Sequence, residues 1–358
     1  MKKIYKNIII GSGFSAFIVN IFLKKDFLVI TSHEKFLDDF PTRNNLTNYL
    51  KFFTKKFHSK GMYRFKLRNS ELHDTIIHGG NTNLWGGICN IQEIKNYIKN
   101  FKNIIKFKKI TSGDTGNFSN KTNLYQMQNY HGSRNNIFNS KNFFKKIVFG
   151  HLVKFNIIKK NLICLYIKEK KIKKIYCKNL ILAINFVQLV EVLINSKVLR
   201  DKDFISLEEY EFKTIVSFKK SLNSYKKNMV VLAYSLPGIL KHYLGLQKNF
   251  NKFFFRLLSF FPLYYNQIFY KNKKYAFYRV NKKRRLIEEI YSKTDLNFGK
   301  SIHYFNMKIN NIKLNKLLKI KSKNIYGVSS PFIESANPGP ISDSIINTSI
   351  QISSKLNR

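Results

Sequence analysis

Apolar runs separated by short polar turns predict a strand, a helix and a second strand at the start of the chain. Ile4–Ile10 is an apolar run of strand length, and a glycine turn at residues 11–13 ends it. Residues 15–24 continue as an apolar helix, and Phe27–Thr31 is again strand-like. This βαβ order predicts an α/β fold class.

The middle of the chain predicts an antiparallel meander that leads into a buried strand. Three short strand-like runs lie close together in the sequence, at residues 153–158, 162–167 and 172–177. The apolar run 179–185 follows, and a helical run then reaches Ser196. A last helix is predicted at residues 342–356, soon after Pro338-Gly339-Pro340.

Residues 206–295 form an insert that matches no motif. It contains two strand-like stretches and two long apolar runs, at 211–219, 276–280, 229–246 and 253–270. Proline and charged residues interrupt both apolar runs, so neither spans a bilayer easily. Two interpretations stay open: a helical cap over a substrate pocket, or segments lying in a membrane interface. The flanking basic stretches 271–274 and 281–285 would suit anionic lipid.

The amino-acid composition changes this picture little, although the net charge of the chain is large. The chain of 358 residues carries 64 Lys+Arg against 20 Asp+Glu, a net charge of +44. Only 10 of the basic residues are Arg, the side chain that phosphate and base readers favour. We interpret the lysine excess first as compositional drift, and second as a sign of a surface that binds nucleic acid or a membrane. The three cysteines form no CxxC pair, so neither a disulfide framework nor a zinc site is expected.

The first glycine turn has the spacing of a dinucleotide-binding loop. Gly11-Ser12-Gly13-Phe14-Ser15-Ala16 follows the pattern G-x-G-x-x-A between two strands. Gly11 permits the sharp turn, Gly13 lets the backbone approach a pyrophosphate, and Ala16 lets the helix pack closely. The acidic residue expected at the tip of the second strand is absent, so Ser32 is the expected ribose contact ahead of Glu34.

A second glycine-rich segment surrounds the only tryptophan of the chain. Residues 78–90 contain four glycines around Trp85. The segment is either a hairpin with a buried tryptophan or a loop that lies against a planar ligand, since glycine lets backbone N–H groups come close.

Five segments, in order, resemble the glucose-methanol-choline family of FAD-dependent oxidoreductases. They are GSGFSA from Gly11, GGNTNLWGG from Gly79, KNLILAIN, GKSIHYFNM with His303, and NIYGVSSPFIESANP with Asn337-Pro338. The resemblance implies an α/β fold, in which an FAD-binding Rossmann-like domain of that family's type is joined to a smaller α+β substrate domain. It places the FAD domain at 1–205, including a loop at 111–140 that acts as a lid or a mobile connection. The substrate or cap domain is 206–295, and 296–358 returns to the FAD domain.

The resemblance also implies an activity and a set of site residues. The expected reaction oxidises a CH–OH group of an alcohol or sugar-like substrate, with hydride passing to flavin N5. His303 is the expected base, Asn337 its partner and His78 a weaker rival. FAD is expected to be non-covalent, because Leu84 stands where some members attach it through histidine. The expected cofactor contacts are Gly11, Ser12, Gly13, Phe14, Ser15, Ser32, Gly80, Asn81, Thr82, Asn83, Trp85, Val153, Ala183, Gly327 and Pro338; no metal is expected.

Departures from the family keep a second hypothesis open. Asn185 stands where glycine is usual, the ribose acid is missing and the chain is short. The alternative is a non-catalytic member of the same fold that acts as a binding or membrane-surface protein. We expect no specific nucleic-acid partner and a cytoplasmic location; peripheral contact with the inner face of the membrane through 229–285 stays open.

Overall fold

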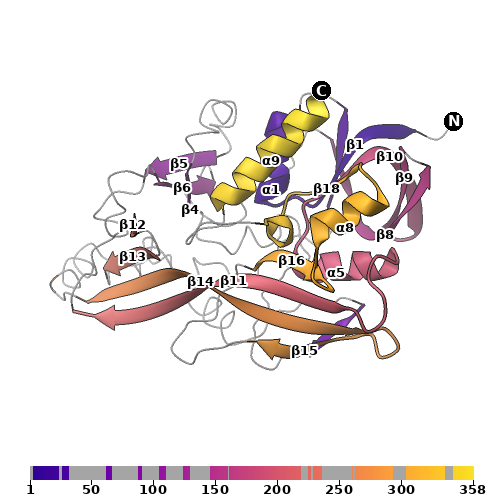
Figure 1. Cartoon of the computed structure of the whole chain (residues 1–358). Coiled ribbons are helices and arrows are strands. Elements are labelled where there is room, and N and C mark those ends of the chain that lie inside the picture. Colours follow the sequence, from indigo (N-terminus) through magenta and orange to yellow (C-terminus); the bar gives the residue numbers. More distant parts are fainter. Residues whose placement is uncertain are drawn as a thin grey trace.

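The computed structural model places two main sheets and a small third one, joined by helices (Figure 1). The structure describes residues 3–23, 26–31, 62–66, 88–90, 105–109, 124–129, 146–159, 161–218, 225–226, 229–235, 260, 263–292, 304–334 and 342–358.

The first sheet contains seven strands among the described residues, in the order β7-β2-β1-β10-β9-β8, with β18 also paired to β10. Their bounds are β1 Ile4–Ile10, β2 Phe27–Thr31, β7 Ile147–Phe149, β8 His151–Lys159, β9 Leu162–Lys168, β10 Ile172–Leu182 and β18 Ile325–Gly327. Strands β7, β2, β1, β10 and β18 are parallel, while β9 is antiparallel to both β8 and β10. The predicted α/β class, with a Rossmann-like βαβ start, is confirmed.

Strand β10 joins two elements that the sequence pattern separates. The runs predicted at 172–177 and 179–185 form one strand, Ile172–Leu182. Its first half pairs with β9, which completes the meander, and its second half pairs with β18 on the same side. One strand therefore belongs to both the antiparallel and the parallel part of the sheet.

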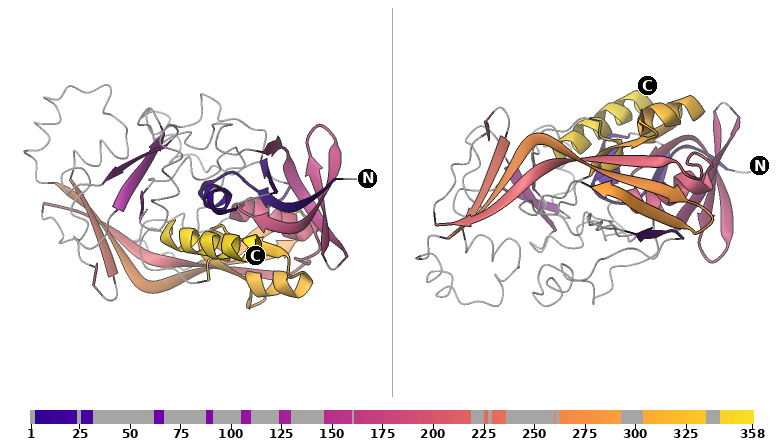
Figure 2. Two further views of the ribbon diagram at one scale, coloured as in Figure 1. Left: turned by 90° about the horizontal axis from the view of Figure 1, so that it is seen from above. Right: turned by 60° about the horizontal axis from the view of Figure 1, so that its bottom comes forward.

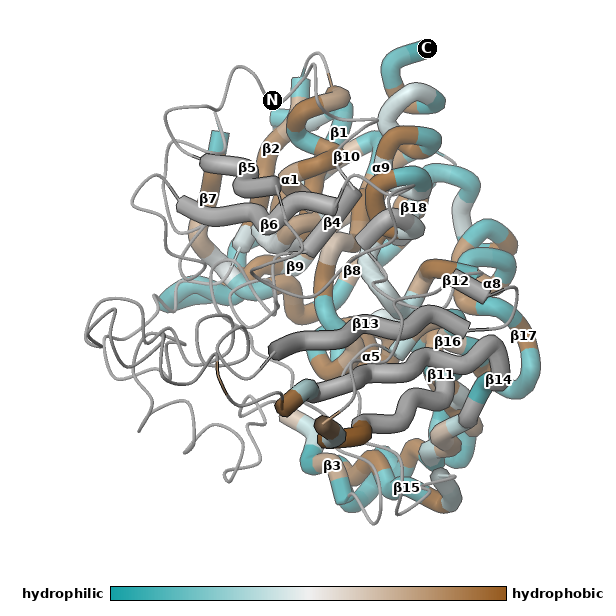
Figure 3. The backbone as a smooth tube through the Cα atoms, turned by 90° about the vertical axis from the view of Figure 1, so that its left-hand side faces the viewer, coloured by the Kyte–Doolittle hydropathy of each residue, from teal (hydrophilic) through white to brown (hydrophobic). Residues whose placement is uncertain are grey.

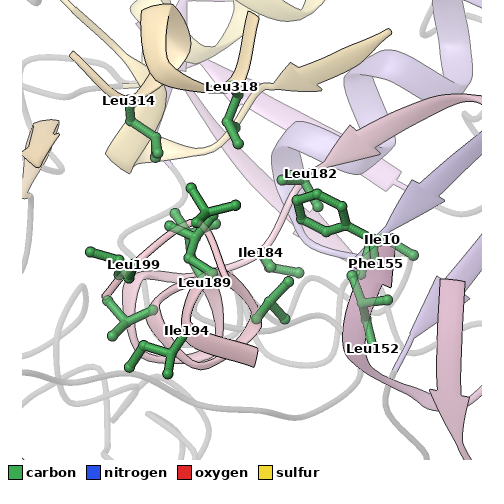
Figure 4. Packing of buried hydrophobic residues seen from close by; sticks show 14 of the residues in the cluster. Ile10, Leu152, Phe155, Leu182, Ile184, Leu189, Ile194, Leu199, Leu314 and Leu318 are labelled. Atoms are coloured by element: carbon green, nitrogen blue, oxygen red, sulfur yellow. The ribbon is translucent and has the colours of Figure 1, made fainter. Parts of the chain in front are cut away.

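Helices cover both faces of this sheet, and the alternation of side chains explains which helix covers which face. Ile9, Val29 and Ile181 pack with α1 (Phe14–Phe22) and α9 (Ser342–Asn357). The residues between them on the same strands pack with α5 (Phe186–Asn195) and α8 (Leu314–Lys321). Figure 4 shows Ile10, Leu182 and Leu152 facing α5. Figure 3 shows that β2 and α1 consist mainly of hydrophobic residues.

The second sheet is antiparallel except at one edge. Its order is β12-β13-β14-β11-β16-β17, with β15 on β14 and β3 parallel to β15. The bounds are β3 Arg64–Lys66, β11 Phe204–Ser217, β12 Tyr225–Lys226, β13 Met229–Ser235, β14 Tyr264–Asn281, β15 Leu286–Ser292, β16 Phe305–Ile309 and β17 Ile312–Lys313. Both views of Figure 2 show β11 and β14 running beside one another as a long ribbon.

Two expectations for the connecting regions were wrong where the structure describes them. Met229–Ser235 and residues 264–270, expected as parts of a helical cap, are strands that pair with each other. Aromatic and β-branched residues are common in both runs, and such residues favour strands. The expected loop 111–140 contains β6 (Leu124–Asn129), which pairs with β4 (Ile88–Asn90) and β5 (Ile105–Lys109). None of the described helices is long and apolar enough to cross a bilayer.

A candidate cofactor site at the carboxyl ends of the parallel strands

The carboxyl ends of β1, β2, β10 and β18 meet at one edge of the first sheet. The Gly11 N–H donates to the Ile30 carbonyl at 2.8 Å, and the Ala183 N–H donates to the Ile10 carbonyl at 2.8 Å. The Val328 N–H donates to the Leu182 carbonyl at 3.1 Å. Three expected cofactor contacts, Gly11, Ala183 and Gly327, therefore lie at the edge where open α/β sheets bind their ligands.

Gly11 is required by the close approach of the neighbouring strand. Its φ of +107° lies in the region that favours glycine, and a Cβ there would lie 2.3 Å from the Ala183 carbonyl oxygen. The sharp turn after β1 is therefore fixed by the way β10 packs against it. No other residue type fits without separating the two strand ends.

The turn leads into the amino terminus of α1, which carries no negative charge. Gly13 is the N-cap residue, with extended φ and ψ of −80° and −169°, and it has no side chain with which to cap the helix. The first turn contains no acidic residue. Uncapped N–H groups at the positive end of a helix bind phosphate oxygens. The residues present therefore fit a pyrophosphate.

Ser12 connects the turn to the tip of β2. Its hydroxyl lies 2.7 Å from the Thr31 hydroxyl, and both side chains are buried. This pair fixes the distance between the glycine turn and the strand end at which a ribose would bind. Ser32, the expected ribose contact, is the next residue and lies outside the described part of the chain.

Two further positions have local structural partners. The Val153 carbonyl, at the start of β8, accepts a hydrogen bond of 3.1 Å from the Asn195 amide. Asn185, which stands where the family usually has glycine, caps α5: its side-chain oxygen accepts the Gln188 N–H at 2.9 Å. Asparagine is a favoured N-cap residue, which gives a structural reason for this departure.

Gly327 lies directly beneath an aromatic ring. A Cβ on Gly327 would come within 2.0 Å of the Phe332 ring, which is 2% exposed. The glycine therefore permits the 3-10 turn η5 (Ser330–Phe332) to fold back over the end of β18. Its contact with a cofactor stays a prediction.

The expected catalytic pair lies outside the described residues, but the segments that flank it are joined. The Asn306 N–H donates to the Ile333 carbonyl at 2.8 Å. His303 precedes Asn306 by three residues and Asn337 follows Ile333 by four, so each lies within about 14 Å of that bond along an extended chain. Gly80, Asn81, Thr82, Asn83, Trp85 and Pro338 also lie outside the described part, as does His78.

A buried carboxylate near these segments was not foreseen from the sequence. Glu208 on β11 is 3% exposed and accepts hydrogen bonds from Asn306 Nδ2, Lys308 Nζ and Lys273 Nζ at 2.7, 2.7 and 2.8 Å. Burial raises the pKa of the Glu208 carboxyl, but the three donors together outweigh it and lower the pKa below its ordinary value. Asn306 has a φ of +49° and sits beside a register shift between β11 and β16. Glu208 thus fixes the strand that begins just after His303.

The sequence contained one signal for this cluster. Glu208 and Glu209 are adjacent acids in an otherwise strongly basic chain, and a strand must place them on opposite faces. The lysine partners come from β14 and β16, far away in the sequence. Their assignment needed the strand pairing.

Comparison with known proteins gave only distant similarities. No protein-family model and no curated protein matches the sequence. A flavoprotein/dehydrogenase structure from Cytophaga hutchinsonii aligns at 9% identity and a TM-score of 0.38, covering 99% of this chain and 77% of that one. A structure of BexE, studied for oxidation during BE-7585A biosynthesis, aligns at 7% identity and a TM-score of 0.28, covering 74% of this chain and 43% of that one. At these TM-scores neither similarity bears on the site, so its interpretation rests on the strand edge itself.

Proposed function

We propose that the protein is an FAD-dependent oxidoreductase that oxidises a CH–OH group of an alcohol or sugar-like substrate, with FAD bound non-covalently. The observation that carries the proposal is the meeting of Gly11, the amino terminus of α1 with its glycine N-cap, Ala183 and Gly327 at one edge of the parallel strands. A dinucleotide is the ligand that this arrangement fits best. The five motif segments favour FAD among the dinucleotides.

The chemistry requires the chain to remove a hydroxyl proton and to hold the substrate oxygen. Bound FAD would supply the hydride acceptor. An imidazole suits proton removal because its pKa is close to working pH, and His303 is the residue we assign to it. The Asn337 amide is assigned to orient the same oxygen while staying neutral. The Asn306–Ile333 hydrogen bond supports this pairing, because it holds the two flanking segments together.

The carboxyl-terminal helix offers a further contribution. α9 begins at Ser342, five residues after Asn337, and packs against α1. We assign its positive amino-terminal end to the side of the cofactor that gathers negative charge on reduction.

Reduction of the bound flavin by a substrate, in the absence of oxygen, tests this proposal directly. Protein reconstituted with FAD is mixed without oxygen with a panel of alcohols and sugars, and flavin absorption is followed. We expect bleaching by a substrate in the wild type, and retention of colour without bleaching in His303→Asn. His78→Asn is the matched control, with bleaching preserved. Loss of bleaching in His78→Asn alone would transfer the role of base to His78.

A non-catalytic flavin-fold protein is the second candidate. It is favoured by the absence of an acidic residue where the ribose is expected, at residues 31–33. FAD that binds and is reduced by dithionite, but by no alcohol or sugar, would support this candidate instead.

A further inference from the structure

Arginine is concentrated at one end of the second sheet, although it is the minority basic residue. Five of the 10 arginines lie in three neighbouring segments: the loop before β11, the β14–β15 hairpin and β3. They form what we call the arginine surface, and all five are exposed: Arg64, Arg200, Arg279, Arg284 and Arg285. Compositional drift toward lysine would scatter the remaining arginines, so their gathering here requires another reason.

Backbone hydrogen bonds hold the three segments together. The Lys202 N–H donates to the Val280 carbonyl at 2.8 Å, which ties the loop to the end of β14. The Arg64 N–H donates to the Arg285 carbonyl at 2.9 Å, which ties β3 to the hairpin turn. The arginine surface is therefore presented on a fixed backbone at the lower right of Figure 1.

The nearby carboxylates have partners other than the five arginine side chains. Glu288, which lies across the strands from Arg279, pairs with Lys66 at 3.3 Å. Asp201 accepts the Lys282 N–H at 2.7 Å, and Asp203 accepts the Arg200 N–H at 2.7 Å and the Asn310 amide at 2.9 Å. Within the described residues, none of the five arginine side chains forms an ion pair with a carboxylate. Their guanidinium groups are left to bind an anion outside the chain.

One arginine occupies a backbone position that an arginine rarely adopts. Arg285 has a φ of +47°, where glycine or asparagine would be less strained. Lys197 and Lys202 also have positive φ values, of 57° and 67°. The turn conformation places the exposed Arg285 side chain beside Arg284 at the end of the hairpin.

Aromatic side chains lie on the same sheet face as Arg279. Strand pairing places Phe204 beside Arg279 and Tyr291 beside Phe277, and all four point away from the core. Phe204 is 43% exposed and Tyr291 is 55% exposed. Exposed aromatic rings beside basic groups suit the headgroup region of a membrane.

We infer that the arginine surface docks the protein onto an anionic phospholipid membrane. Arginine forks bind phosphate oxygens, and basic residues near a membrane are attracted by its negative surface potential. A second copy of the chain is disfavoured because two such surfaces would repel each other. A nucleic acid is disfavoured because bases bind to ring faces, and these rings already contact neighbours. The Arg279 guanidinium lies 4.9 Å from the Phe204 ring centre, Tyr275 stacks on Phe277 at 6.3 Å, and Tyr291 lies tilted against Phe277 at 6.3 Å.

A pair of charge-matched variants tests the inference without any flavin chemistry. In the surface variant Arg64, Arg200, Arg284 and Arg285 become Gln; Arg279 is kept because it packs on Phe204. In the control variant four exposed lysines of the β8–β10 meander, Lys159, Lys170, Lys171 and Lys178, become Gln. Both variants lose the same charge from the whole chain. Binding is measured by co-sedimentation with vesicles of phosphatidylcholine alone and of phosphatidylcholine with phosphatidylserine.

We expect the wild type and the control variant to bind the phosphatidylserine vesicles, and the surface variant to bind them about tenfold or more weakly. Neutral vesicles should bind none of the three. Equal weakening of both variants would assign binding to overall charge and would overturn the inference, as would no weakening in either. Tighter binding to single-stranded RNA than to vesicles, lost only in the surface variant, would overturn it in favour of a nucleic acid. Circular dichroism checks that the variants are folded.

Discussion

At the scale of single residues, substitutions of Gly13 can test cofactor binding without lowering the stability of the fold. As the N-cap of α1 it has a φ of −80°, which any residue adopts, and Asp and Asn are equally good N-cap residues. Gly13→Asp adds a negative charge where the pyrophosphate is expected, while Gly13→Asn has the same shape and no charge. We expect both variants to be at least as stable as the wild type to urea.

Both variants place a side chain where Gly13 lets the backbone approach the pyrophosphate, but the charged variant should lose more FAD affinity than the neutral one. Titration followed by flavin fluorescence should give a dissociation constant at least about tenfold weaker for Gly13→Asp than for Gly13→Asn, since one repulsive contact of about 1.4 kcal/mol suffices. Equal affinities in the two variants would mean that the phosphates bind elsewhere.

Gly327 and Phe332 form a pair whose packing can be measured separately from function. An alanine Cβ at position 327 would overlap the Phe332 ring, so Gly327→Ala should lower the free energy of unfolding by about 1–3 kcal/mol. Phe332→Leu removes the obstructing ring edge at its own cost. In a double-mutant cycle followed by urea unfolding, we expect the double variant to be more stable than the sum of the two changes predicts, by about 1 kcal/mol. Strictly additive changes in the free energy of unfolding would show that residues 327 and 332 do not interact.

At the scale of elements, Glu208 links β11, β14 and β16. Removing its charge should destabilise the protein, because two lysines and Asn306 lose a charged acceptor. We expect Glu208→Gln to cost about 2 kcal/mol near pH 7, less than for a fully buried pair since the lysines reach solvent. Glu288→Gln, which breaks the exposed pair with Lys66 on the same sheet, should cost under about 0.5 kcal/mol.

The cost of Glu208→Gln should depend on pH in a defined direction. The pKa of Glu208 is lowered in the folded protein, so its carboxylate contributes stability above its unfolded pKa of about 4.3 and loses it as the pH falls through the folded value. The wild type and the variant should therefore converge in stability below about pH 4. A difference that stays constant from pH 7 to pH 3 would show that packing, not charge, is responsible.

Elements with local signals could be predicted, and elements that depend on distant pairing could not. Ile4–Ile10, Phe27–Thr31 and the last helix were predicted within a residue or two, because apolar runs and glycine or proline breaks mark their ends. The helix expected at residues 15–24 is shorter, ending at Phe22. In the insert, one of the two open interpretations predicts helix where the structure has β13 and the first part of β14. Their apolar runs are uniform along the chain, and only their pairing distinguishes strand from helix.

At the scale of the whole molecule, the sequence predicted the sheet edge of the candidate site but not which strands make up the second sheet. The glycine turn, Ala183 and Gly327 are recognisable because each needs a small residue. The boundaries 1–205, 206–295 and 296–358 stay a prediction, and the second sheet takes β3 and β16 from outside the middle range. β3 pairs with β15 at an edge of the sheet, whereas β16 lies between β11 and β17. No local pattern in the sequence marks either pairing.

Near its carboxyl end the chain passes from the second sheet back to the first. β16 belongs to the second sheet, whereas β18 and α9 complete the first. His303 and Asn337 lie on either side of this passage between sheets. Docking of the two sheets, rather than either alone, is what would bring the expected pair to the cofactor.

The absorption spectrum of the purified protein, before and after incubation with FAD and removal of the excess, tests the central claim most directly. We expect flavin bands with about one FAD per chain, released intact when the protein is denatured, since the FAD is held non-covalently. A folded protein that stays colourless and retains no added FAD would show that the chain does not bind FAD.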